Sequence, residues 1–254
     1  MAWLQRMRRA EILRHPFPPE WREILARNVP AVAKLDAGER ATLEDKVRIF
    51  LAEKNLEGCG GLELTDEMRV TIAAQACLLL LHLEGDAVFP TVESVLVYPT
   101  AYKAPQARRA GGIVLDDQAR LGESHSRGAI VLAWDAVKRT ARGGPKNLVL
   151  HEFAHALDQE DGVADGTPEL PEAAMYRAWA RVLGAEYEHL VAEMHAGHAT
   201  SLDPYGAENA AEFFAVVTEA FFGRPAELRR EHPALYEQLR AFYRQDPASR
   251  ASPY

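Results

Sequence analysis

The chain has 254 residues, of which 48% are hydrophobic and 26% charged, and its formal net charge at pH 7 is −8. This acidic balance argues against a protein that binds nucleic acid or an anionic membrane, because both need a basic surface. Two cysteines are far fewer than a disulfide-stapled secreted domain carries. The longest apolar run, residues 71–83, is too short to span a bilayer, and the basic N-terminus has no apolar stretch of the signal-peptide kind. We therefore expect a cytoplasmic protein.

Residues 1–85 are predicted to be helical, with loops between the helices. Pro19 favours a helix start because proline fits the first helical turn. Residues 31–51 carry apolar side chains at near-helical spacing, and Thr65 resembles the cap of a further helix. Residues 70–83 are apolar nearly all round, so we expect a buried helix there.

Short β-branched runs bounded by Gly, Asp and Ser follow in the middle of the chain, at residues 92–98, 112–115 and 129–134. Such runs are typical of strands, and we expect a small, mostly antiparallel sheet packed on the helix that follows it. The run 129–134 is either a plain core strand or an edge along which an extended peptide binds.

Helices are predicted to dominate from residue 135 onward, at residues 149–157, 171–196, 208–222 and 233–244. With the strands before them they give an α+β fold. We expect one unit over residues 1–254, in which 1–85 form a helical part and 86–254 hold the sheet and the zinc-binding helices.

The sequence His-Glu-Phe-Ala-His at residues 151–155 is the sharpest chemical signal. His151 and His155 lie four residues apart, so a helix projects both imidazoles from one face toward a single ion. Zinc suits such a site because it accepts nitrogen and carboxylate ligands. Glu152 would then lie beside the open coordination position, where it can act as the general base. Apolar neighbours make this a buried helix, in which two unsatisfied histidines would be costly.

A catalytic zinc ion needs a third protein ligand. The class whose third ligand is a histidine six residues after the second is excluded, because Asp161 occupies that position. Glu208, Glu212 and Glu219 share one face of a later apolar helix and are the candidates. Glu212 is central and needs a partner among its apolar neighbours, Glu208 could simply favour the helix dipole, and Glu219 could orient a ligand histidine.

Two further residues have open roles. Tyr205 precedes the acidic helix, and its phenol can either donate a hydrogen bond to a developing oxyanion or pack at the helix entry. Asp158 lies two turns after His151, where it can orient an imidazole or simply end the helix.

The motif His-Glu-Phe-Ala-His-Ala-Leu-Asp at 151–158, with Tyr205 and the stretch Asn-Ala-Ala-Glu-Phe-Phe-Ala at 209–215, resembles the Mlc titration factor A family of bacterial zinc peptidases. It is similar, more distantly, to the peptidase domain of anthrax lethal factor. The family pattern also covers residues 122–128, where His125 departs from the expected aromatic residue.

The resemblance implies a gluzincin-like domain in which one Zn²⁺ is held by His151, His155 and Glu212, with Tyr205 stabilising the transition state. It further implies aminopeptidase-type hydrolysis of short peptides and binding to the Mlc-type transcriptional repressor of glucose uptake. The alternative function is a repressor-sequestering binding protein in which peptidase activity is secondary or absent. A third alternative is a structural zinc site. Such a site would have no open coordination position, and chelation of the zinc would unfold the domain.

Overall fold

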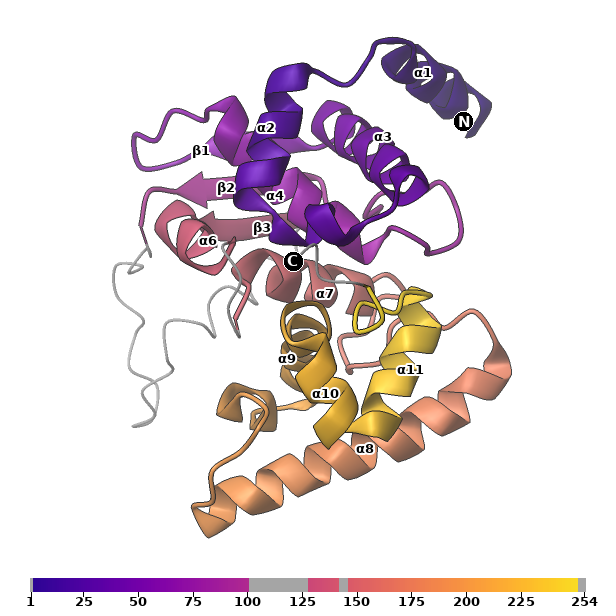
Figure 1. Cartoon of the computed structure of the whole chain (residues 1–254), viewed down its shortest axis with the longest axis vertical. Helices are drawn as coiled ribbons and strands as arrows, with labels where there is room; N and C mark the ends of the chain where they lie inside the picture. The colour runs from indigo at the N-terminus through magenta and orange to yellow at the C-terminus, as the bar shows by residue number, and fades with distance from the viewer. Residues whose placement is uncertain (1, 101–127, 142–145, 251–254) are drawn as a thin grey trace.

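The computed structural model describes residues 2–100, 128–141 and 146–250. The predicted strand 112–115 and His125 lie outside these ranges. The described residues form many helices and one small sheet (Figure 1). In chain order the elements are α1 (Ala2–Arg14), α2 (Pro19–Asn28), η1 (Pro30–Lys34), α3 (Ala37–Glu53), β1 (Asn55–Gly58), α4 (Asp66–Leu79), β2 (Ser94–Tyr98), β3 (Ala129–Ala133), α6 (Trp134–Ala141), α7 (Leu148–Asp158), α8 (Ala173–Ala196), η2 (Pro204–Ala207), α9 (Ala210–Gly223), α10 (Pro225–Glu231) and α11 (Pro233–Tyr243).

The helix starts follow local signals in the sequence. Pro19 opens α2, and the Thr65 hydroxyl accepts the backbone N–H of Met68 at the start of α4, as predicted. The start of α3 is a capping box, in which Asp36 and Glu39 each accept the other's backbone N–H. The predicted buried helix is α4, whose residues from Val70 onward are all buried.

The sheet has the strand order β1-β2-β3, and both pairs are parallel, so the prediction of a mostly antiparallel sheet is wrong. The reason lies in the connections. Antiparallel neighbours can be joined by a tight turn, but α4 lies between β1 and β2 and brings the chain back to the same end of the sheet. The strand β1 was not predicted either, because residues 1–85 were expected to hold only helices and loops.

The N-terminal region of the apolar core lies between the sheet, the N-terminal helices and α7. Its centre is aromatic: the ring centroid of Phe153 on α7 is 5.6 Å from that of Phe50 on α3 and 4.6 Å from that of Phe89. Phe153 is fully buried and lies about 200° around the helix from His151. Burial of Phe153 therefore turns the histidine face of α7 away from this region of the core.

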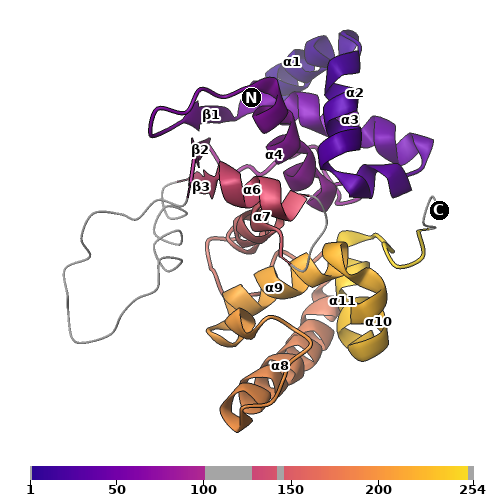
Figure 2. The same cartoon turned by 60° about the vertical axis from the view of Figure 1, so that its left-hand side comes forward.

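The C-terminal region of the same core joins α8, α9 and α11 on the other side of α7 (Figures 1 and 2). Phe214 of α9 contacts Trp179 of α8 and Phe242 of α11, with ring centroids 5.8 and 6.1 Å apart. Helix α7 packs against both α4 and α9, so it lies between the two regions of the core. None of the described helices is long and apolar enough to cross a membrane.

Candidate metal centre

Helix α7 carries the motif and begins at a well-defined cap. The side chain of Asn147 accepts the backbone N–H of Leu150, at 3.1 Å, which satisfies one of the free donors in the first turn. The backbone N–H of Asn147 donates to the carboxylate of Glu219 on α9. The first turn of α7 is therefore held to α9 at the point where the two helices face each other.

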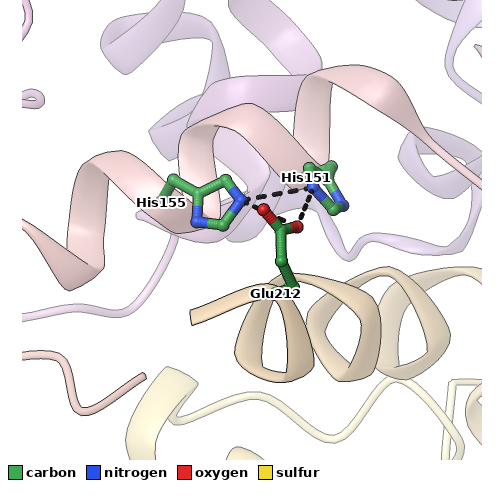
Figure 3. A group of neighbouring side chains, drawn as sticks. All are labelled: His151, His155 and Glu212. Carbon is green, nitrogen blue, oxygen red and sulfur yellow. Dashed lines mark hydrogen bonds and ion pairs between the residues drawn. The ribbon is translucent and has the colours of Figure 1, made fainter. Parts of the chain in front are cut away.

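His151, His155 and Glu212 converge between these helices (Figure 3). The Nε2 atom of His151 is 3.2 Å from Nε2 of His155 and 3.0 Å from Oε2 of Glu212. The third side of this triangle, from Nε2 of His155 to Oε2 of Glu212, is 3.3 Å. The three side chains are only 13, 11 and 18% exposed. Helix α7 supplies both nitrogens and α9 supplies the oxygen.

The triangle has the dimensions of a zinc site. Zinc binds histidine nitrogen and carboxylate oxygen at about 2.0–2.1 Å, so in a tetrahedral site the ligand atoms lie about 3.3 Å apart. The three observed separations are within a few tenths of an ångström of this value. Two nitrogens and one oxygen also form the donor set of catalytic zinc sites, which leave a fourth position open. The residues present therefore fit a zinc ion.

Glu219 determines which nitrogen of His151 is available. Its Oε1 lies 2.8 Å from Nδ1 of His151, so Nδ1 faces Glu219 and Nε2 faces the centre of the triangle. Burial lowers the pKa of His151, but its hydrogen bonds to Glu212 and Glu219 outweigh this effect and raise that pKa to about 10. The carboxylates of Glu212 and Glu219, which favour a proton on His151, would also favour a metal cation beside it.

The charge of Glu212 is stabilised by the same contacts. Burial alone would raise its pKa, but hydrogen bonds from His151 and His155 hold that pKa well below its usual range. Glu212 is therefore ionised at neutral pH, as a metal-binding carboxylate must be. Its position also depends on a cap, because the side chain of Asn209 accepts the backbone N–H of Glu212 at 3.0 Å.

A cavity of about 560 Å³ opens onto this group and is lined by His151, Glu152, His155, Tyr205, Glu212 and Glu219. The five residues predicted to form the site, which are all of these except Glu219, therefore line a single cavity. Glu152 is only 3% exposed and is one of the residues that line the cavity. The volume is large enough for part of a peptide chain.

Tyr205 enters the cavity from η2, and its ring centroid is 5.9 Å from that of His151. Asp203 starts η2 by accepting the backbone N–H of Tyr205, and Asp203 also binds Lys146 at 2.5 Å. Burial, together with the charge of Glu212, raises the pKa of Tyr205, so its hydroxyl stays protonated and can donate. Asp203 and Lys146 were not predicted from the sequence, although an Asp followed by Pro is a recognisable helix cap.

Asp158 and Glu208 lie outside the three-residue group. Helix α7 ends at Asp158, whose fully buried carboxylate accepts the backbone N–H of Gly166 at 2.9 Å. Burial raises the pKa of Asp158 to about 6. Glu208 is exposed and follows η2 as its C-terminal cap. Of the three acids that share a face in the sequence, the structure brings Glu212 and Glu219 to His151.

Known proteins are similar to this chain over nearly its whole length. Residues 3–244 match the family model of the glucose-regulated metallo-peptidases M90. The uncharacterized protein slr2042 of Synechocystis sp. is 40% identical over 252 residues, which cover 96% of this chain and 90% of the relative. Mlc titration factor A of Serratia proteamaculans is 33% identical over 91% of this chain and 88% of the relative. The protein of the same name from Klebsiella pneumoniae is also 33% identical, over 91% and 87%.

The family match and the group of two histidines and one carboxylate indicate a metallopeptidase. The chain belongs to the M90 family of glucose-regulated metallo-peptidases, since the family model spans nearly its whole length. The predicted resemblance to the Mlc titration factor A family is thereby confirmed. A metal ion is implied by the family, and His151, His155 and Glu212 are the group in the described part of the chain that could hold it.

Proposed function

We propose that the protein is a zinc-dependent peptidase of the gluzincin type. His151, His155 and Glu212 would hold one Zn²⁺ per chain, and residues 1–254 would form one catalytic unit. The observation that carries the proposal is the triangle of two nitrogens and one carboxylate oxygen with sides of 3.0–3.3 Å, in a chain of a metallopeptidase family. When bound, zinc acts as a Lewis acid toward water and the substrate carbonyl.

Glu152 is proposed as the general base. Glu152 lines the cavity next to His151, where its carboxylate could accept a proton from the attacking water and deliver that proton to the leaving amine. Tyr205 is proposed to donate a hydrogen bond to the oxygen of the reacting carbonyl as negative charge develops there. Its raised pKa keeps the required proton on the phenol throughout the neutral pH range.

The test compares three variants for zinc content and for hydrolysis of small amide substrates. Glu152→Gln should keep one zinc per chain and lose activity by about 10²- to 10⁴-fold, the usual contribution of a general base. Glu212→Ala should lose tight zinc. Glu160→Gln, which removes a carboxylate outside the cavity lining, is the matched control and should remain active. Tight zinc in Glu212→Ala would reject the third ligand, and a wild type that cleaves no amide would reject the peptidase.

The substrate and partner are proposed from the relatives. Aminopeptidase-like hydrolysis of short peptides follows from the family resemblance. Several relatives carry the name Mlc titration factor A, which supports binding to an Mlc-type repressor and hence a cytoplasmic location. The alternative is a repressor-sequestering protein whose peptidase activity is secondary or absent. Glu152→Gln separates the two: retained repressor binding without hydrolysis means that both functions exist and are distinct.

A further inference from the structure

The loop that follows α7 returns to the site at Gly166. The backbone N–H of Gly166 donates to Oδ2 of Asp158, at 2.9 Å, and its carbonyl accepts the indole N–H of Trp179, at 3.1 Å. Asp158 and Trp179 are 0% and 1% exposed, so both hydrogen bonds are shielded from water. Gly166 is thus held from both sides, by the last residue of α7 and by α8.

Gly166 also lies directly against the start of α9. Its φ is +79°, and a Cβ added at this position would lie only 2.3 Å from the carbonyl oxygen of Ala210. Ala210 is the first residue of α9 and precedes Glu212 by two residues. Only a residue without a side chain allows so close an approach of two backbones.

The first turn of α9 is held by the cap at Asn209 and by the contacts of Glu212, but it packs little against the apolar core. Glu208, Asn209 and Ala210 are exposed, and the buried side chains of this helix begin at Phe213. Glu212 lies between the exposed and the buried part. The contact of Gly166 with Ala210 therefore acts at the end of α9 where packing against the core is weakest.

We infer that Asp158 and Gly166 form a strut that positions Glu212 opposite the two histidines. The strut runs from the last residue of α7, through the backbone of Gly166, to the first residue of α9. Metal sites tolerate deviations of only about 0.2 Å in ligand distance, so a small shift of the first turn of α9 weakens metal binding. The inference rests on the proposed zinc site, and it makes Asp158 and Gly166 positioning residues that do not touch the metal.

The loop itself offers a matched control. Gly162 also has a positive φ, +92°, but an added Cβ would meet nothing within 4 Å. Gly162→Ala and Gly166→Ala therefore share the backbone strain, and only Gly166→Ala pushes on Ala210. With Zn²⁺ alone as the probe, competition with a chelator should show a zinc Kd at least tenfold weaker for Gly166→Ala than for Gly162→Ala. Equal zinc affinities in the two variants would overturn the inference.

A second pair of variants tests the other end of the strut. Asp158→Asn keeps an oxygen that can accept the N–H of Gly166, and Asp158→Ala does not. Zinc should bind to Asp158→Ala several-fold more weakly than to Asp158→Asn, at a temperature where circular dichroism shows both folded. Wild-type zinc affinity in Asp158→Ala would also overturn the inference. Zinc binding by Glu212→Ala serves as the reference: if that variant binds like wild type, the metal site itself is wrong, whichever result the strut variants give.

Discussion

His151 contacts the other two candidate metal ligands on one side and, on the other, the carboxylate that binds the start of α7. One nitrogen faces Glu212 and His155, and the other faces Glu219, which also accepts the backbone N–H of Asn147. A single carboxylate thus orients the imidazole and binds the first turn of the helix that carries it. Such outer hydrogen bonds fix both the tautomer and the ring orientation of a ligand histidine. The geometry of the candidate site therefore depends on Glu219, which is not one of the three candidate ligands.

The proposed role of Tyr205 as a hydrogen-bond donor can be tested by removing its hydroxyl oxygen. Tyr205→Phe keeps the ring beside His151 and deletes the proposed oxyanion donor. We expect kcat to fall by about 10²- to 10³-fold, as for other oxyanion donors, with zinc content unchanged. The measurement is steady-state hydrolysis of a small amide substrate together with metal analysis.

Tyr187→Phe is the matched control for this substitution. The hydroxyl of Tyr187 donates a hydrogen bond to the carbonyl of Ala207 in η2, the segment that contains Tyr205. Tyr187 is not one of the residues that line the cavity. Its kcat should stay within about twofold of wild type if a hydroxyl matters only where it can donate to the oxyanion. Equal losses in the two variants would show that Tyr205 acts by holding η2 in place.

The sequence predicted the candidate residues better than it predicted their arrangement. Two histidines at i and i+4 must share a helix face, so His151 and His155 could be paired from spacing alone. Spacing could not separate Glu208, Glu212 and Glu219, because all three lie on one predicted face. The structure separates Glu208 from the others, since α9 begins after it and leaves it exposed. That boundary depends on the cap at Asn209, which periodicity does not reveal.

Among the elements, the helices and the strands at 92–98 and 129–134 were predicted well, but the strand direction and β1 were not. Caps and apolar periodicity are local, so α4, α7 and α11 could be recognised from short windows. Strand direction depends on a partner far away in the chain. The strand β1 has only four residues, Asn-Leu-Glu-Gly, and none is β-branched. Its strand conformation comes from pairing with β2, which no local pattern shows.

The cap of α7 gives a prediction at the scale of one element. Asn147→Ala removes the side-chain acceptor for the N–H of Leu150 and should lower the free energy of unfolding by about 1 kcal/mol. Asn147→Ser keeps a capping oxygen and should recover most of the loss. Urea denaturation of the three proteins measures the difference. An Asn147→Ala variant as stable as wild type would mean that this cap contributes nothing to α7.

In the whole molecule, α7 lies between an N-terminal and a C-terminal aromatic region of one continuous apolar core, and the three-residue group lies between α7 and α9. Phe153 on one face of α7 packs toward the N-terminal region, and the opposite face meets α9, which is anchored by Phe214 in the C-terminal region. A metal ion here would add a link between parts that already pack together. It would stabilise the molecule without being required for its folding.

Metal removal should therefore lower thermal stability and leave the fold intact. A ligand that binds only the folded state stabilises it by RT ln(1 + [L]/Kd), about 2.7 kcal/mol at a hundredfold excess over Kd. We expect a chelator to lower the Tm of wild type by several degrees in differential scanning fluorimetry. Circular dichroism at 25 °C should keep its helical signal, because the two aromatic regions of the core do not involve the metal. Glu212→Ala should show no chelator effect. Complete loss of helix on chelation would instead identify a structural zinc site, and an unchanged Tm in wild type would show that no metal is bound between α7 and α9.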